Sequence, residues 1–368
     1  MRLARYLIME VYNFSAGPAM LPKEVMENAK EEFCDFMGTG CGVMELSHRG
    51  PQFMEVLATA KQNTRDLMNI SDDYEICFIQ GGASMQFAMI PMNLLPAGGI
   101  ADYADSGTWS AKAIQEAERF GKVNIIGSSK STNYDRIPLV RHWKPSENAA
   151  YLHITSNNTI AGTQYHTFPP VPAGVPMIAD MSSDFMSRVI DVNDFGMLYG
   201  GAQKNLGPSG MALVIIRKDL AERTPDTVPA MLRYKTYISK DSMFNTPPTF
   251  AIYMYKQVTE WMKNKGGLAV IEEINNTKSE AIYELLDRSG FYRSPVEPGS
   301  RSKMNVVFRL PSEELEAKFI KEAAQNGMSG LKGHRSVGGV RASIYNAMPL
   351  AGVEALIDFM IEFEKKNG

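Results

Sequence analysis

The sequence predicts an α/β protein, in which a large domain with a mainly parallel central sheet precedes a smaller C-terminal α+β domain. Short apolar segments alternate with helical segments through most of the chain, as they do where helices cover a parallel sheet. This alternation stops after Gly266-Gly267. The length of 368 residues also suits two domains, at roughly 150 residues per domain.

The large domain is expected to span residues 15–265. Apolar segments of strand length occur at 75–80, 99–104, 122–127, 150–155, 175–179, 195–200 and 211–217. Helical periodicity is found at 23–37 before a break at 38–42, from Arg65 to near Ser71, from Ser84 onward and at 109–120.

The small domain is expected to span residues 266–368, and the segment 1–14 is expected to pack with it. Its predicted elements are helices at 268–288, 312–325 and 353–366 and strands at 305–310 and 340–345, with a glycine-rich segment ending at Gly339. Met1 and Met9 are both candidates for the start of the protein.

Composition excludes several classes of function. The formal net charge is −3, with 38 Lys and Arg against 41 Asp and Glu, which argues against nucleic acid or an anionic membrane as the main partner. The three cysteines, Cys34, Cys41 and Cys77, lack disulfide-scaffold or zinc-site spacing, so we expect no metal and a reducing cytoplasm. No apolar run reaches the ~18 residues of a membrane span, and the N-terminal segment is too short and interrupted for a signal peptide.

Gly81-Gly82-Ala83-Ser84 lies between a predicted strand and a predicted helix. Glycines let the backbone approach a ligand closely, and a helix start offers unpaired N–H groups to phosphate. A plain turn is the alternative interpretation, and the Gly-Lys-Ser/Thr ending of a nucleotide P-loop is missing.

Asp180 and Lys204 follow consecutive predicted strands, where ligands of open α/β sheets bind. A carboxylate at Asp180 can keep a pyridinium nitrogen protonated, although a turn or helix-cap role is the alternative. Lys204 stands among glycines and small residues between two buried strands, which is unusual for a surface charge. A lysine that forms a Schiff base needs a pKa lowered from ~10.4 by burial or a nearby cation.

Two His-Arg pairs, His48-Arg49 and His334-Arg335, lie beside glycines in predicted loops. Imidazole and guanidinium donors suit phosphate or carboxylate, so these pairs predict an anion site unless they are unrelated surface loops. Arg341 lies in an apolar strand, where a buried arginine needs an anionic partner.

Trp109 opens a helix and either stacks on a flat ring or packs in the core. The remaining histidines, His142, His153 and His166, are interpreted as structural.

Together these segments resemble the phosphoserine aminotransferases, a family of fold-type-I enzymes that depend on pyridoxal 5'-phosphate. The resemblance runs from Asn13-Phe-Ser-Ala-Gly-Pro-Ala to Arg341-Ala-Ser-Ile-Tyr-Asn-Ala-Met-Pro-Leu, nearly the whole chain. Its most specific motifs are Gly201-Ala-Gln-Lys-Asn and Gly333-His-Arg-Ser-Val-Gly-Gly-Val-Arg.

The resemblance implies a role for each candidate residue. Lys204 would hold the cofactor as a Schiff base and carry a proton to and from the substrate. The other cofactor contacts would be Asp180 at the ring nitrogen, Trp109 on the ring face, Thr159 at the ring hydroxyl, and Ala83, Ser84 and Gln203 at the phosphate, joined there by Asn245 and Thr246 of a second subunit. Arg341 would bind the substrate α-carboxylate, and His48, Arg49, His334 and Arg335 the distal anion.

Ser84 departs from the family pattern, because many members have an arginine there that helps to bind the distal anion. Because Ser84 replaces this arginine, binding of the distal anion depends more on the two His-Arg pairs. The resemblance also implies a homodimer with shared active sites.

The implied reaction exchanges an amino group between L-glutamate and 3-phosphohydroxypyruvate, giving O-phospho-L-serine and 2-oxoglutarate, with a phosphorylated keto acid of pyridoxine biosynthesis as a further substrate. A cysteine desulfurase is excluded, because no cysteine follows Cys77. An aminotransferase of the alanine–glyoxylate type and a non-catalytic protein that binds a phosphate ligand remain as alternatives.

Overall fold

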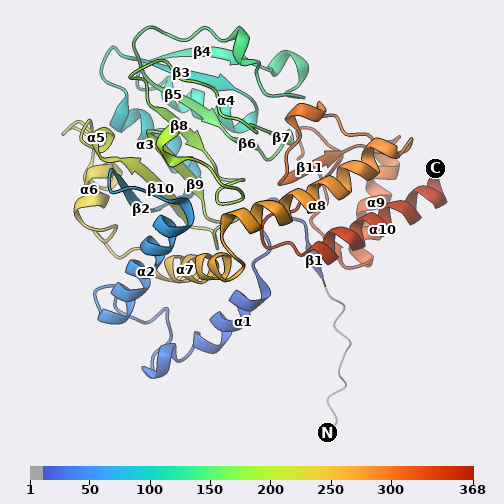
Figure 1. Cartoon of the computed structure of the whole chain (residues 1–368), viewed down its shortest axis with the longest axis horizontal. Coiled ribbons are helices and arrows are strands. Elements are labelled where there is room, and N and C mark those ends of the chain that lie inside the picture. Colours follow the sequence, from blue (N-terminus) through green and yellow to red (C-terminus); the bar gives the residue numbers. More distant parts are fainter. Residues whose placement is uncertain (1–10) are drawn as a thin grey trace.

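A seven-stranded sheet forms the centre of the molecule within residues 11–368, the part of the chain that the computed structural model describes (Figure 1). Whether Met1 or Met9 is the start lies outside these residues. From edge to edge the strands are β2 (Tyr74–Gln80), β10 (Met211–Arg217), β9 (Met197–Gly201), β8 (Met177–Asp180), β5 (Ala149–Thr155), β3 (Ile100–Asp105) and β4 (Lys122–Ser128).

The sheet is mainly parallel, because only β10 runs opposite to its two neighbours among these seven strands. The carboxyl ends of β2, β9, β8 and β5 therefore meet at one edge of the sheet. Ligands of such sheets bind at this edge.

Helices cover both faces of the sheet, which explains why its strands are apolar on both sides. In β10, Leu213 and Ile215 pack in one hydrophobic cluster, and Val214 and Ile216 pack in the other. The first cluster includes residues of α1 (Lys23–Glu32), α2 (Pro51–Met68) and α7 (Thr249–Asn264). The second includes residues of α3 (Gly82–Leu94), α4 (Thr108–Ala117), α5 (Lys218–Ala221) and α6 (Tyr234–Ser239).

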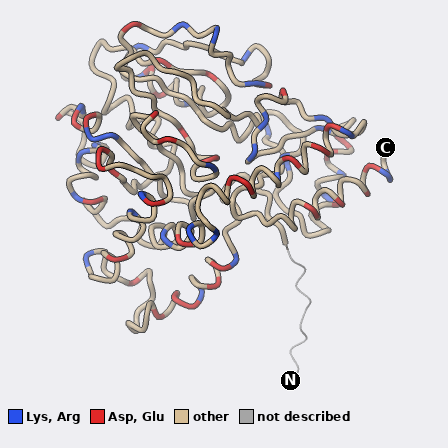
Figure 2. The backbone as a smooth tube through the Cα atoms, in the orientation of Figure 1, with Lys and Arg blue, Asp and Glu red and all other residues tan. Residues whose placement is uncertain are grey.

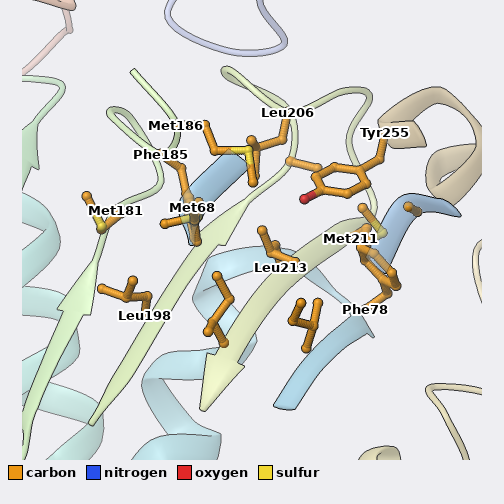
Figure 3. Packing of buried hydrophobic residues seen from close by; sticks show 14 of the residues in the cluster. Met68, Phe78, Met181, Phe185, Met186, Leu198, Leu206, Met211, Leu213 and Tyr255 are labelled. Atoms are coloured by element: carbon orange, nitrogen blue, oxygen red, sulfur yellow. The ribbon is translucent and has the colours of Figure 1, made fainter. Parts of the chain in front are cut away.

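Several methionines belong to the first cluster, and Figure 3 shows Met68, Met181, Met186 and Met211 among its packed side chains. Met68, Met186 and Met211 are each no more than 3% exposed. Unbranched thioether side chains adapt to irregular gaps, which suits these methionines to a core position.

The C-terminal part forms a third cluster with its own elements. These are α8 (Leu268–Arg288), β11 (Asn305–Phe308), α9 (Glu313–Gln325), β12 (Met328–Ser329), β13 (Val340–Ser343) and α10 (Leu350–Asn367). β11 pairs antiparallel with β13. Near the N-terminus, β1 (Tyr12–Asn13) pairs in parallel with β12, and Phe14 is fully buried in the third cluster. A domain boundary at 265/266 stays a prediction.

Some elements differ from those expected. The helix predicted at 23–37 ends at Glu32, because the chain turns back there: Asp35 accepts a hydrogen bond from the backbone N–H of Gly40, at 2.8 Å, and Met37 has a φ of 52°. The short helices α5 and α6 were not predicted, since neither is long enough to establish a period.

Acidic and basic residues are interspersed along the described chain (Figure 2). Among residues 11–368, no helix combines the length and the apolar character that a bilayer crossing requires.

Candidate active site

A cavity of about 310 Å³ lies at the edge where the parallel strands end. It receives Thr155 from the end of β5, Asp180 from the end of β8, and Lys204 from the turn after β9. The full lining is Gly81, Gly82, Ala83, Ser84, Phe87, Trp109, Thr155, Asn157, Thr159, Asp180, Ser182, Ser183, Gln203, Lys204, Ser209 and Gly210.

Lys204 lines this cavity and is buried, with 9% of its surface exposed. Its Nζ donates to Thr159 Oγ1 at 2.6 Å and lies 5.9 Å from the centroid of the Trp109 ring. Burial lowers the pKa of Lys204 to about 8; the negative charge of Asp180 opposes this shift, and the charge of Arg341 adds to it. A lysine with this pKa has a substantial neutral fraction near pH 8, which a nucleophilic amine requires.

Asp180 is 4% exposed and faces the same cavity. Its Oδ1 accepts hydrogen bonds from the Ser182 backbone N–H at 3.0 Å and from the Ser182 hydroxyl at 2.6 Å. Burial raises the pKa of Asp180, whereas the two Ser182 donors and the positive charge of Lys204 act in the opposite direction. The turn interpretation of Asp180 is therefore correct locally, but the same carboxylate also lines the cavity.

The Gly81-Gly82 turn leads directly into α3, whose first residues line the cavity. Gly81 and Gly82 have φ values of 93° and 69°, which glycine adopts at little steric cost. The free N–H groups at the start of this 13-residue helix therefore border the cavity and suit an anion. Trp109, in the first turn of α4, lines the same space, and its buried Nε1 has no hydrogen-bond partner in the part of the chain that the structure describes.

Cationic groups of the C-terminal part gather beside the cavity. Arg341, on β13, donates from Nη1 to the backbone oxygen of Thr159 at 3.3 Å, and its buried Nε has no partner among the described residues. Burial lowers the pKa of His334, and the charges of Arg341, Arg335 and Lys112 lower it further. These side chains therefore form a local positive field in a chain of slightly negative net charge.

Seven predicted site residues are not part of the cavity lining: Arg341, His334 and Arg335 of the C-terminal part, and His48, Arg49, Asn245 and Thr246. Arg49 is exposed, and its Nε bonds His48 Nε2 at 3.3 Å. Asn245 and Thr246 are exposed and are bonded by the Gln80 side chain. They do not cap α7, since Pro248 precedes that helix and no side chain caps it.

Sequence analysis missed several cavity residues, including Thr155, Asn157, Ser182 and Ser183. The buried hydroxyl of Thr155 has no hydrogen-bond partner within residues 11–368. Its position as the last residue of a predicted strand was the available signal. Ser182 and Ser183 follow Asp180 closely, but small polar residues after a strand are too common to stand out.

His153 is a buried core residue, in agreement with its structural interpretation. Its ring stacks on Tyr103 with centroids 4.8 Å apart, and its Nε2 pairs with the Tyr199 hydroxyl at 2.8 Å. Burial lowers the pKa of His153 to about 3. Within residues 11–368, no cluster of three or more His, Cys, Asp or Glu side chains is arranged to hold a metal ion.

The sequence profile of the class-V aminotransferases matches residues 11–356. A phosphoserine aminotransferase of Halalkalibacterium halodurans is 54% identical over 353 residues, covering 96% of this chain and 98% of the relative. The chain belongs to the phosphoserine aminotransferase family.

Solved structures of this family share the fold over nearly their full length. The phosphoserine aminotransferase of Bacillus circulans subsp. alkalophilus gives a TM-score of 0.96 at 50% identity, covering 98% of this chain and 99% of its own. The PLP-bound enzyme of Trichomonas vaginalis gives a TM-score of 0.92 at 39% identity, covering 96% of this chain and 100% of its own. The predicted fold class and the assignment to the aminotransferases are thus confirmed.

Proposed function

We propose that this chain transfers an amino group reversibly between L-glutamate and 3-phosphohydroxypyruvate, giving O-phospho-L-serine and 2-oxoglutarate, with pyridoxal phosphate as cofactor. The observation that carries the proposal is one cavity that holds a buried lysine of lowered pKa and a buried carboxylate, in a chain of this family. Amino transfer to 2-oxoglutarate from phosphoserine and from alanine, measured side by side, tests it. A preference for alanine would favour the alanine–glyoxylate type instead.

The cavity residues suit both the phosphate and the ring nitrogen of pyridoxal phosphate. The start of α3, with Ala83, Ser84 and Gln203, suits the phosphate, and Asp180 suits the ring nitrogen. The unpartnered hydroxyl of Thr155 and the unpartnered Nε1 of Trp109 leave polar atoms for a bound group to satisfy. When bound, pyridoxal phosphate supplies a ring that withdraws electrons from the substrate α-carbon.

Lys204 is proposed to attach the cofactor covalently and to move the proton at the substrate α-carbon. Its amine is positioned by the Thr159 hydroxyl, and Trp109 is proposed to cover the ring face. Thr159 is also the proposed contact of the ring hydroxyl. Both tasks of Lys204 need the neutral amine, which burial favours.

Capture of pyridoxal phosphate by the apo-protein is expected to follow the titration of Lys204. Because burial lowers the pKa of Lys204 to about 8, the neutral fraction rises by about tenfold between pH 7 and pH 9 and then levels off. An amine at its ordinary pKa would keep gaining reactivity up to about pH 10. Borohydride reduction followed by mass spectrometry of the Lys204 peptide measures this rate. A rise without a plateau contradicts the lowered pKa.

Both amino donors carry a carboxylate at one end and a second anion at the other, so one pocket serves both. Arg341 is proposed to bind the α-carboxylate, because its guanidinium lies beside Thr159 with a buried, unpartnered Nε. His334 and Arg335, with His48 and Arg49, are proposed to bind the distal phosphate or carboxylate. Because Ser84 carries no charge, binding of the distal anion is left to the two His-Arg pairs.

Arg335→Ala and Arg49→Ala are each expected to reduce kcat/KM for phosphoserine and glutamate by about tenfold or more, the order for losing a hydrogen bond between charged groups. The absorption spectrum of the bound cofactor should not change. Lys332→Ala, in the same loop as Arg335 and exposed, is the matched control and should retain activity. Loss of cofactor with normal use of both substrates would mean that the arginine binds a different anion.

A homodimer with shared active sites is part of the proposal. Asn245, Thr246 and Arg49 are exposed and His48 is partly exposed, and all four lie outside their own chain's cavity, so they are available to a second subunit. Exposed apolar side chains lie close to them in sequence: Met44 is 51% exposed and Phe244 is 43% exposed. Apolar side chains at such a surface are suited to burial against a second copy.

Mixing one inactive variant with one of strongly reduced activity tests the shared site. Lys204→Ala and Arg49→Ala subunits should form mixed dimers, each with one site that is complete in both residues. Random pairing would restore about a quarter of wild-type activity, since half of the dimers are mixed and each has one working site. No recovery after demonstrated subunit exchange would mean that each chain completes its own site.

The cytoplasm is the proposed location. Cys34 and Cys41 are exposed and unpaired, and Cys77 is buried and unpaired, which suits a reducing compartment.

A further inference from the structure

We infer that Ser182 is a positioning residue that fixes the Asp180 carboxylate, so that one carboxylate oxygen stays available to the cofactor ring nitrogen. The inference rests on the proposed function, in which Asp180 pairs with that nitrogen. Ser182 is the second residue after Asp180 and lines the same cavity.

Ser182 engages a single oxygen of the carboxylate with two donors. Its backbone N–H lies 3.0 Å and its hydroxyl 2.6 Å from Oδ1 of Asp180. The other oxygen, Oδ2, receives no hydrogen bond from residues 11–368. Oδ1 of the carboxylate is therefore fixed by hydrogen bonds, whereas Oδ2 is free to accept one from a bound group.

The direction of the Ser182 hydroxyl is set by a third contact. The backbone N–H of Gly201, at the end of β9, donates to Ser182 Oγ at 3.1 Å. Because this N–H occupies an acceptor site of the hydroxyl, the single hydroxyl hydrogen is free to point at Asp180 Oδ1. Strand β9 thereby orients the serine, and the serine orients the carboxylate.

Burial makes this support necessary. Asp180 is 4% exposed and Ser182 is 8% exposed, so little water is available to stabilise the charge. Burial raises the pKa of Asp180, and the hydrogen bonds from Ser182 are the leading effects that lower it again. The charged form is the one that can pair with a protonated ring nitrogen. The other titratable groups that face Asp180 are Lys204, Asp184 and Tyr199.

Ser183 provides a matched comparison in the same turn. It is also buried and lines the cavity, but its hydroxyl donates to the Asn157 backbone oxygen at 2.8 Å and accepts from Asn157 Nδ2 at 2.8 Å. Its hydroxyl makes no hydrogen bond to a carboxylate within residues 11–368. Ser183→Ala therefore removes the same atom as Ser182→Ala without altering the support of Asp180.

The test compares Ser182→Ala, Ser183→Ala and Asp180→Asn in the full chain, with folding checked by circular dichroism. We expect Ser182→Ala to weaken pyridoxal phosphate binding by about tenfold, the order for one lost hydrogen bond to a charged group. The ¹⁵N chemical shift of the ring nitrogen in labelled cofactor should move toward its unprotonated value. With 1-deazapyridoxal phosphate, which has no ring nitrogen, Ser182→Ala and wild type should bind equally well.

An unchanged ¹⁵N shift in Ser182→Ala, or equal weakening by Ser183→Ala, would overturn the inference. So would an equal loss of affinity for the deaza analogue, since the serine would then act through packing alone. Asp180→Asn separates this failure from failure of the proposed function. If that variant also leaves the ¹⁵N shift unchanged, Asp180 is not the partner of the ring nitrogen at all.

Discussion

Replacing Lys204 with alanine is expected to abolish amino transfer while leaving a folded protein that binds pyridoxal phosphate without a covalent bond. The side chain is the only buried amine in the described lining of the cavity, with its Nζ held 2.6 Å from Thr159 Oγ1. Its loss removes both the covalent attachment and the group that moves the α-proton. General acid–base help alone is typically worth about 10²–10⁴-fold in rate.

Single-turnover measurements with phosphoserine check this result, with the visible spectrum before and after borohydride as the second readout. Lys112 offers a matched control, because its Nζ lies 4.6 Å from the centroid of the same Trp109 ring but the residue is exposed. Lys112→Ala should keep its activity and its borohydride-sensitive spectrum. Turnover of Lys204→Ala within tenfold of wild type would remove the basis of the proposed function.

Tyr255→Ala is expected to cost about 3–5 kcal/mol of stability, the usual cost of emptying an aromatic site in a core. Tyr255 is fully buried between the sheet and α2 (Figure 3). Its ring packs edge-on against Phe78 with centroids 5.1 Å apart, and its hydroxyl pairs with Thr64 Oγ1 at 2.6 Å. The backbone of Tyr255 also lies against Gly207, three residues after Lys204. The substitution should therefore loosen the turn that presents the lysine.

Urea unfolding of the apo-protein measures the effect on stability. Tyr255→Phe keeps the ring and loses only the hydroxyl, so it should cost about 1 kcal/mol. The hydroxyl of Thr64 keeps its bond to the Ala60 carbonyl, at 2.7 Å, in that variant. Equal destabilisation by both substitutions would mean that the hydrogen bond, and not the packing of the ring, dominates at this position.

One hydrogen bond connects the C-terminal part to the turn that carries Lys204, and a second network holds the C-terminal segment of that bond in place. Asn205, next to Lys204, accepts from the Asn346 backbone N–H at 3.0 Å. Lys278 is fully buried, and its three ammonium donors reach the carbonyls of Ile344, Tyr345 and Met348 at 2.7–3.1 Å. Because β13 carries Arg341 and ends just before this segment, the same contacts fix the arginine relative to the lysine.

The sequence by itself determined which segments form the strands of the sheet and at which edge of the sheet the cavity lies. β10 and α8 have the predicted bounds, because both have a hydrophobic period that packing preserved. Asp180 and Lys204, which both line the cavity, could be selected as candidates because strand ends and a glycine-rich setting restrict where such residues occur. The aminotransferase assignment also followed from local motifs, which need no knowledge of distant contacts.

Only the tertiary structure decided how the site residues act on one another. The support of Asp180 by Ser182, and of Ser182 by Gly201 on the neighbouring strand, depends on strand register, which no local pattern encodes. The lowered pKa of Lys204 likewise comes from burial by residues far apart in sequence. His48, Arg49, Asn245 and Thr246 lie outside the cavity of this chain, and their place in the site of a second subunit stays a prediction, because the fold of one chain does not contain a surface shared between two.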